Sequence, residues 1–262
     1  MSFGKRHSGP SAPQGLPPAS AYALSALPSS QLSAPNSIDI RKDQGKAVTS
    51  GAISSVEKFL LETYDDRSGG NAETMLSAAG ALAGFAAQEA VWEGIVRPGR
   101  MPAAKAFVRV ETKSGEMYFF GEAVDALLAS LEKTQLSIWT LITMAAVTSD
   151  APSLPELGPI FEHCRETVGT PAFDVPILPG HLALKESPRQ ALRHWPAIKS
   201  MLLAGNVPPL RWPLEIATAA KELILRKKDV LSGDIGALVV MQAAIRMARV
   251  DPRKIPGGAT AF

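Results

Sequence analysis

Two glutamates stand four residues apart in a segment that is otherwise almost free of charge. Glu89 falls between Phe85 and Trp92 on one helical stripe, and Glu93 follows one turn later. Desolvation by aromatic neighbours raises the pKa of a carboxyl group, which suits a general acid, a general base or a ligand. An ion-pair interpretation stands beside this one, because Glu93 can pair with Arg97 one turn on, and Glu89 can reach solvent or an arginine of another helix.

A second group of reactive side chains surrounds residue 163. His163 and Glu166 are three residues apart, so they share a helix face and could hold a metal ion together with His181 of the following loop. Cys164 beside His163 also suggests a nucleophile and its base. However, neighbouring residues point about 100° apart on a helix, and Cys164 lies on the apolar stripe, as a small buried hydrophobic residue would. A di-metal carboxylate bundle would need two Glu-x-x-His pairs, which the sequence lacks.

These patterns define the candidate sites. The catalytic candidates are Glu89, Glu93, His163 and His181, and the metal candidates are His163, Glu166 and His181. No cofactor is expected, because no Gly-x-x-x-x-Gly-Lys run or Rossmann fingerprint follows a strand. Gly80 and Gly84 lie inside a predicted helix, and their spacing lets helices approach closely in the core or at a self-association seam.

Two aromatic and two basic residues are candidates for interaction. Trp195 and Trp212 are each followed by a proline and flank a predicted turn. We expect them to anchor two helices, whereas an exposed aromatic corner would be a partner site. Arg246 and Arg249 are expected to face outward on the last helix, where a phosphate backbone or another partner could bind. No aromatic residues alternate with these basic residues, and no helix-turn-helix turn is present, so nucleic acid is an unfavoured partner.

Charge is distributed unevenly along the chain. Residues 51–184 contain nine Lys/Arg against seventeen Asp/Glu, whereas residues 185–262 contain thirteen against six. The two parts either face each other in the folded protein or offer separate surfaces to partners. The single cysteine, Cys164, excludes an internal disulfide and fits a reducing compartment, so a cytoplasmic location of the bacterial type is expected.

Helical periodicity predicts the elements that position these residues. A central helix from Asn71 to Val96 is apolar or small over most of its circumference, as expected for a helix surrounded by others. Residues 106–111 and 117–120 flank a Ser-Gly turn and predict one β-hairpin. Further helices are expected at 49–65, 122–131, 136–147, 159–168, 187–204, 213–228 and 234–250. A capping box of Ser153 and Glu156 would start the 159–168 helix earlier, and Pro196 should kink or split the 187–204 helix.

The chain is expected to divide into three parts. Residues 1–45 form a disordered Pro/Ser-rich tail, residues 46–252 a helical domain with the hairpin near 106–120, and residues 253–262 a loose tail. No uncharged run reaches the roughly 20 residues of a membrane span. The fold class is mainly α: about seven or eight helices around a central Ala/Gly-rich helix, with one inserted β-hairpin.

The sequence contains no complete catalytic or cofactor motif, so it favours a non-enzymatic interaction or scaffold protein that binds a protein partner or itself. One alternative is a metal- or small-ligand-dependent enzyme or binder that uses the Glu/His cluster. It requires a carboxylate of Glu89 or Glu93 to meet an imidazole. A second alternative is a peripheral binder of nucleic acid or an anionic surface through the basic C-terminal helices.

Overall fold

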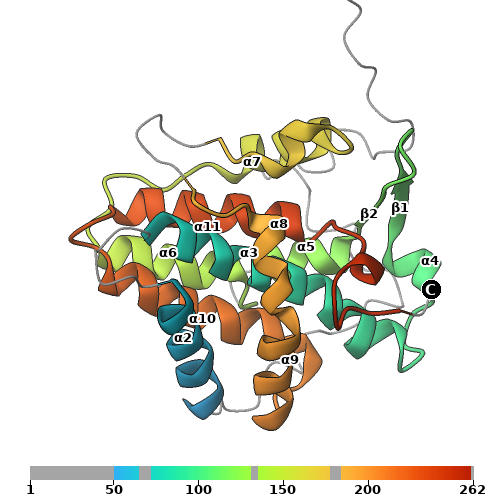
Figure 1. Cartoon of the computed structure of the whole chain (residues 1–262), viewed down its shortest axis with the longest axis horizontal. Helices are drawn as coiled ribbons and strands as arrows, with labels where there is room; N and C mark the ends of the chain where they lie inside the picture. The colour runs from blue at the N-terminus through green and yellow to red at the C-terminus, as the bar shows by residue number, and fades with distance from the viewer. Residues whose placement is uncertain (1–49, 65–71, 131–134, 178–183, 261–262) are drawn as a thin grey trace, which may run out of the picture.

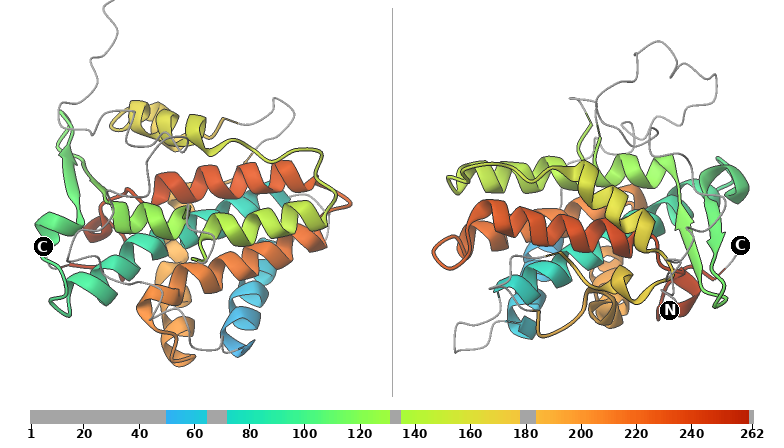
Figure 2. Two further views of the ribbon diagram at one scale, coloured as in Figure 1. Left: turned by 180° about the vertical axis from the view of Figure 1, so that it is seen from behind. Right: turned by 90° about the horizontal axis from the view of Figure 1, so that it is seen from above.

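Helices make up nearly all of the structure, a computed structural model that describes residues 50–64, 72–130, 135–177 and 184–260. Within these ranges, the α-helices of seven or more residues are α2 (Ser50–Tyr64), α3 (Ala72–Val91), α5 (Glu122–Leu128), α6 (Ile138–Thr148), α7 (Leu157–Thr167), α9 (Trp195–Ala204), α10 (Trp212–Arg226) and α11 (Gly233–Met247). The short elements are α4 (Ala103–Ala106), α8 (Pro188–Ala191), a π-helical turn η2 (Trp92–Val96), and the 3₁₀ turns η3 (Pro171–Asp174), η4 (Leu192–His194), η5 (Pro209–Arg211) and η6 (Pro252–Lys254). Strands β1 (Val108–Glu111) and β2 (Met117–Phe120) form one hairpin, so the predicted mainly helical fold is confirmed (Figures 1 and 2).

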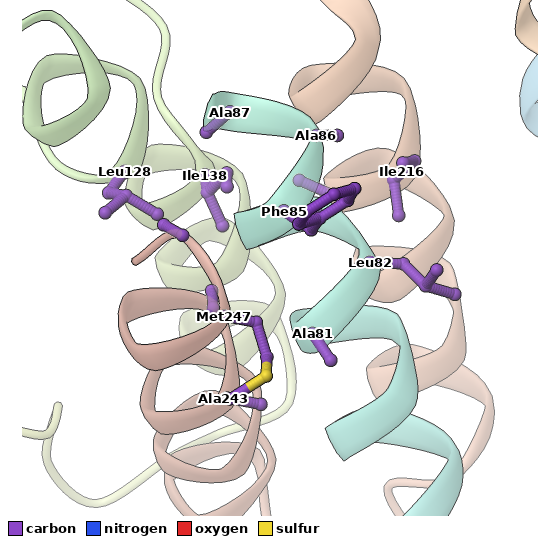
Figure 3. Packing of buried hydrophobic residues seen from close by; sticks show 14 of the residues in the cluster. Ala81, Leu82, Phe85, Ala86, Ala87, Leu128, Ile138, Ile216, Ala243 and Met247 are labelled. Carbon is purple, nitrogen blue, oxygen red and sulfur yellow. The ribbon is translucent and has the colours of Figure 1, made fainter. Parts of the chain in front are cut away.

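Helix α3 lies at the centre of the helical layers, with α10 and α11 packed against it (Figures 1 and 3). Every residue of α3 except Glu73 is buried. Two glycines permit the close approach of α11. A Cβ at Gly80 would lie 2.3 Å from the carbonyl oxygen of Val240, and a Cβ at Gly84 would lie 2.0 Å from that of Ala244. Neither position has room for a side chain, so the four-residue glycine spacing serves core packing.

The hairpin is joined to the helical layers through β2. Its strands pair antiparallel with Val110 opposite Tyr118, and Gly115 in the turn has a φ of 77°. On its other side β2 contacts the segment that directly follows α11, where the Phe119 N–H donates to the carbonyl oxygen of Arg249 over 2.8 Å. A hairpin that would be marginally stable alone is therefore held by this segment.

The helix expected over residues 187–204 is split near Pro196, one of the two outcomes predicted for this proline. α8 and η4 end before Trp195, and α9 begins there with Pro196 in its first turn. Such a position suits proline because its missing N–H has no helical partner there. The described part of the C-terminal tail is held in place: Asp251 caps η6, and Ala259 is buried. The expected disordered segment 1–45 lies outside the described residues.

Candidate functional site

Glu89 is bonded inside the protein by two groups from distant parts of the chain. The burial of α3 on all sides leaves the Glu89 side chain with no exposed area. Lys199 of α9 donates from Nζ to Glu89 Oε2 over 3.0 Å, and the backbone N–H of Ala259 donates to Oε1 over 2.6 Å. Both carboxylate oxygens therefore accept a hydrogen bond, which offsets the cost of burying the charge.

Lys199 is the centre of this arrangement, and we call the lysine with the groups it bonds the Lys199 cluster. Its ammonium also donates to Glu93 Oε1 over 3.3 Å and to the carbonyl oxygen of Gly257 over 3.1 Å. An ammonium has three N–H donors, and the cluster supplies three acceptors. Nζ also lies 5.9 Å and 5.5 Å from the ring centres of Trp195 and Trp212. The lysine is thus held by its three bonds and by two aromatic rings, so it is poorly placed to attack a substrate.

The electrostatics of the cluster follow from burial. Burial raises the pKa of the Glu89 carboxyl above its ordinary value, while Lys199 and the bond from Ala259 lower it. On the outer side, Arg97 donates to Glu93 Oε2 over 2.6 Å, as predicted from their spacing. Four charges of alternating sign therefore run from the surface inward. Both glutamates take part in ion pairs. The partner of Glu89 is a lysine, whereas solvent or an arginine was expected.

The histidine candidates do not join these glutamates. His163 lies on α7, where burial and then the charge of Arg246 lower its pKa, and Glu166 raises it. No hydrogen bond or ion pair connects His163 with either glutamate in the described part of the chain. In Figure 1, α7 and α9 lie at opposite edges of the molecule. His181 lies outside the described residues, so its role stays a prediction.

The metal prediction is also left without its third ligand. His163 and Glu166 are electrostatic neighbours on α7. Among residues 50–64, 72–130, 135–177 and 184–260, no three His, Cys, Asp or Glu side chains are grouped so that they could hold a metal ion. Two ligands on one helix face are too few for a closed protein site.

Cys164 is a buried thiol between α7 and α11. Its Sγ lies 3.9 Å from the carbonyl oxygen of Ile245. Burial raises the pKa of the Cys164 thiol to about 11, against the lowering effect of the nearby arginines. The adjoining hollow has a volume of about 10 Å³, room for about one water molecule. It is lined by Phe120, Phe161, Cys164, Arg165 and Arg249. These surroundings suit a packed thiol and disfavour a thiolate nucleophile.

Arg246 and Arg249 point into the protein, so the prediction that they face outward is wrong. Each is 1% exposed, because α7 and the hairpin cover the side of α11 that was expected to meet solvent. Arg249 bonds to the carboxylate of Asp125 and lies 5.0 Å from the ring centre of Phe120. Arg246 donates from Nη2 to Gln242 Oε1 over 3.4 Å. Its Nε and Nη1 are buried without a hydrogen-bond partner in the described structure.

Trp195 and Trp212 also lie in the core. Their ring centres are 6.0 Å apart, and the Trp212 Nε1–H donates to the carbonyl oxygen of Val207 over 2.9 Å. Their expected role as anchors of two helices is confirmed by this burial. Because Trp195 and Trp212 are buried, they do not form an exposed aromatic corner for a partner. The buried Arg246 and Arg249 likewise do not face a partner.

Sequence reasoning missed Lys199 and the segment around Ala259. These partners lie 110 and 170 residues from Glu89, so no local spacing connects them. The one signal was the position of Glu89 on an apolar stripe, since a buried carboxylate requires donors from somewhere.

Comparison with known proteins does not assign a function to this chain. No protein-family model, curated protein or solved structure matches it. The function is therefore argued from the residues and contacts described above.

Proposed function

We propose that the protein is a non-enzymatic interaction protein that binds a protein partner through the outer face of α6. The observation that carries this proposal is an exposed apolar surface on a helix without any charged residue. Met144 and Val147 are 53% and 63% exposed, and residues three apart lie on the same helix face. Single exposed apolar residues are ordinary, but a contiguous apolar surface without charge is typical of a protein-binding site.

The opposite face of α6 fixes the helix to the core. Its buried residues pack against α10 and α11, and Ser137 caps its start by accepting a bond from the Thr140 N–H over 3.2 Å. A helix held in this way presents its outer face with little ordering cost on binding, which favours association. No helix in the described ranges combines the length and apolar character needed to cross a membrane.

The competing functions have less support. The Lys199 cluster uses its charged groups in mutual hydrogen bonds, and its glutamates have no bond to His163. The anionic-surface hypothesis depended on Arg246 and Arg249, whose burial keeps them from a phosphate backbone. An apolar protein surface is the partner chemistry that fits the exposed face of α6.

The test compares two glutamate-substituted variants. Met144→Glu/Val147→Glu places charges on the outer face of α6, and Leu203→Glu makes the same kind of change at a residue that is 56% exposed on α9. Affinity purification with quantitative mass spectrometry should recover a protein with wild type and Leu203→Glu that is lost with the α6 variant. Circular dichroism and thermal melting check that both variants fold.

A partner recovered in this way should still bind the His163→Ala variant, because the proposed surface excludes that residue. Recovery of the same proteins at the same level with both glutamate variants would refute the role of α6. Loss of binding in His163→Ala would instead favour the Glu/His alternative.

A further inference from the structure

One edge of the hairpin is closed and the other is open. In an antiparallel pair, the N–H and C=O of a residue point to the same side, and successive residues alternate between the two sides. The Phe119 N–H donates to the carbonyl oxygen of Arg249, which follows the end of α11, so the backbone of Phe119 points away from β1. Its direct partner Arg109, and Glu111 two residues on, must therefore point their backbone groups away from β2.

The outward groups of β1 have no partner in the described part of the chain. No hydrogen bond uses the backbone N–H or C=O of Arg109 or Glu111, and neither side chain forms an ion pair there. Val108, on the same strand, is 46% exposed. Figure 1 shows β1 outside β2, at the margin of the molecule. An open edge of this kind is a template for another strand.

The edge is complementary to itself. If two copies of β1 pair antiparallel about a twofold axis at Val110, Arg109 stands opposite Glu111 of the partner subunit, and Glu111 opposite Arg109 of the partner subunit. This register satisfies all four outward N–H and C=O groups of these two residues in each copy. It also places opposite charges directly across from one another, twice. Val108 then lies opposite Thr112 of the partner subunit, which covers part of its exposed surface.

We propose that β1 pairs with β1 of a second copy of this chain to form a four-stranded antiparallel sheet across a twofold axis. Any extended peptide would make the same backbone bonds. The Arg-x-Glu sequence favours an antiparallel strand that also reads Arg-x-Glu, because each arginine then lies opposite a glutamate. The second copy supplies that strand. Because the edge is only four residues long, the dimer is weak and reversible.

The pairing deepens the proposed interaction function by naming one partner, and it uses a surface other than α6. Arg109→Glu places like charges opposite one another in both pairs, and so does Glu111→Arg. The double variant Arg109→Glu/Glu111→Arg restores opposite charges in the same register. Within one chain these residues face Phe119 and Met117, so no internal ion pair is lost. Lys228→Glu, at an exposed residue before α11, makes the same change in net charge as Arg109→Glu but away from the edge.

Sedimentation velocity of the full chain at low salt, over a range of concentrations, tests the proposal. Wild type and Lys228→Glu should show a dimer fraction that rises with concentration. Each single edge variant should raise the dimer dissociation constant by about tenfold, and the double variant should return it toward the wild-type value.

A second variant tests the backbone bonds. Arg109→Pro removes one outward N–H without removing a bond to β2, and it should weaken the dimer as well. A wild type that stays monomeric at all concentrations, or a double variant no better than the singles, would overturn the proposal. Neither result bears on the α6 proposal. Likewise, a loss of partner binding in the α6 variant should leave dimerisation through β1 unchanged.

Discussion

Substitution of Lys199 by methionine would isolate a buried carboxylate. Methionine has a similar length and fills much of the same space, but it carries no charge. Glu93 keeps Arg97 as a partner, 2.6 Å away, whereas Glu89 keeps only the N–H of Ala259. The substitution therefore acts mainly through Glu89, which has no exposed area.

The expected loss follows from the burial of the pair. Removal of one partner of a buried ion pair costs about 3–5 kcal/mol. Because Lys199 is 17% exposed and partly screened, we expect the lower end, about 3 kcal/mol near neutral pH. For a protein of this size, 1 kcal/mol corresponds to about 2–4 °C, so the melting temperature should fall by roughly 6–12 °C.

The loss should depend on pH in a definite direction. Burial already raises the pKa of Glu89, and removal of Lys199 removes the main effect that lowers it. A carboxyl group whose pKa is higher in the folded state than in the unfolded state lowers stability as pH rises through the folded pKa. The variant should therefore be most deficient at neutral and higher pH. Its deficit should shrink as pH falls and Glu89 takes up a proton.

Urea unfolding followed by tryptophan fluorescence, near neutral pH and at about pH 5, measures this difference. Glu89→Gln in the Lys199→Met background should recover part of the stability, because a neutral amide tolerates burial better than an isolated carboxylate. Lys228→Met, at an exposed lysine, is the matched control and should change little. A deficit that is the same at both pH values and is not relieved by Glu89→Gln would refute the reasoning.

Three further outcomes test the packing. Gly84→Ala should lower stability by about 2–3 kcal/mol, because its Cβ would overlap the carbonyl oxygen of Ala244, whereas Gly158→Ala, with nothing within 4 Å, should be neutral or stabilising in the same melts. Arg246→Met should raise stability by about 1–3 kcal/mol in urea unfolding, since it removes a buried cation with two unsatisfied nitrogens, and a loss would show that the guanidinium is needed. Cys164, with a pKa raised to about 11, should react with a disulfide reagent at mildly alkaline pH only after unfolding; fast labelling of the native protein would contradict its burial.

The fold was predictable because its determinants are local. The apolar circumference of the central helix predicted its burial, and the structure places α3 between α10 and α11. The aromatic and β-branched residues around the Ser-Gly turn predicted the hairpin in its observed place. Helix ends were less predictable, because Pro196 permits either a kink or a new start and only tertiary packing decides between them.

In the candidate site, the local contact was predictable and the long-range contacts were not. The spacing of Glu93 and Arg97 is contained within one turn, and their ion pair was found from it. The partners of Glu89 come from α9 and from the C-terminal segment, whose placement depends on the packing of the whole chain. The position of Glu89 on an apolar stripe implied that its carboxylate needs donors, without identifying which residues would supply them.

The burial of Arg246 and Arg249 changes how the basic C-terminal part of the chain is interpreted. Helical periodicity divides a helix into an apolar and a polar face, and it assumes that the polar face meets water. Here α7 and β2 cover that face, so Arg249 is neutralised by Asp125 inside the protein. Part of the excess positive charge of residues 185–262 is therefore neutralised inside the protein by acidic residues of the middle part of the chain. The two surfaces proposed above for a partner, the uncharged face of α6 and the open edge of β1, both favour a protein over a polyanion.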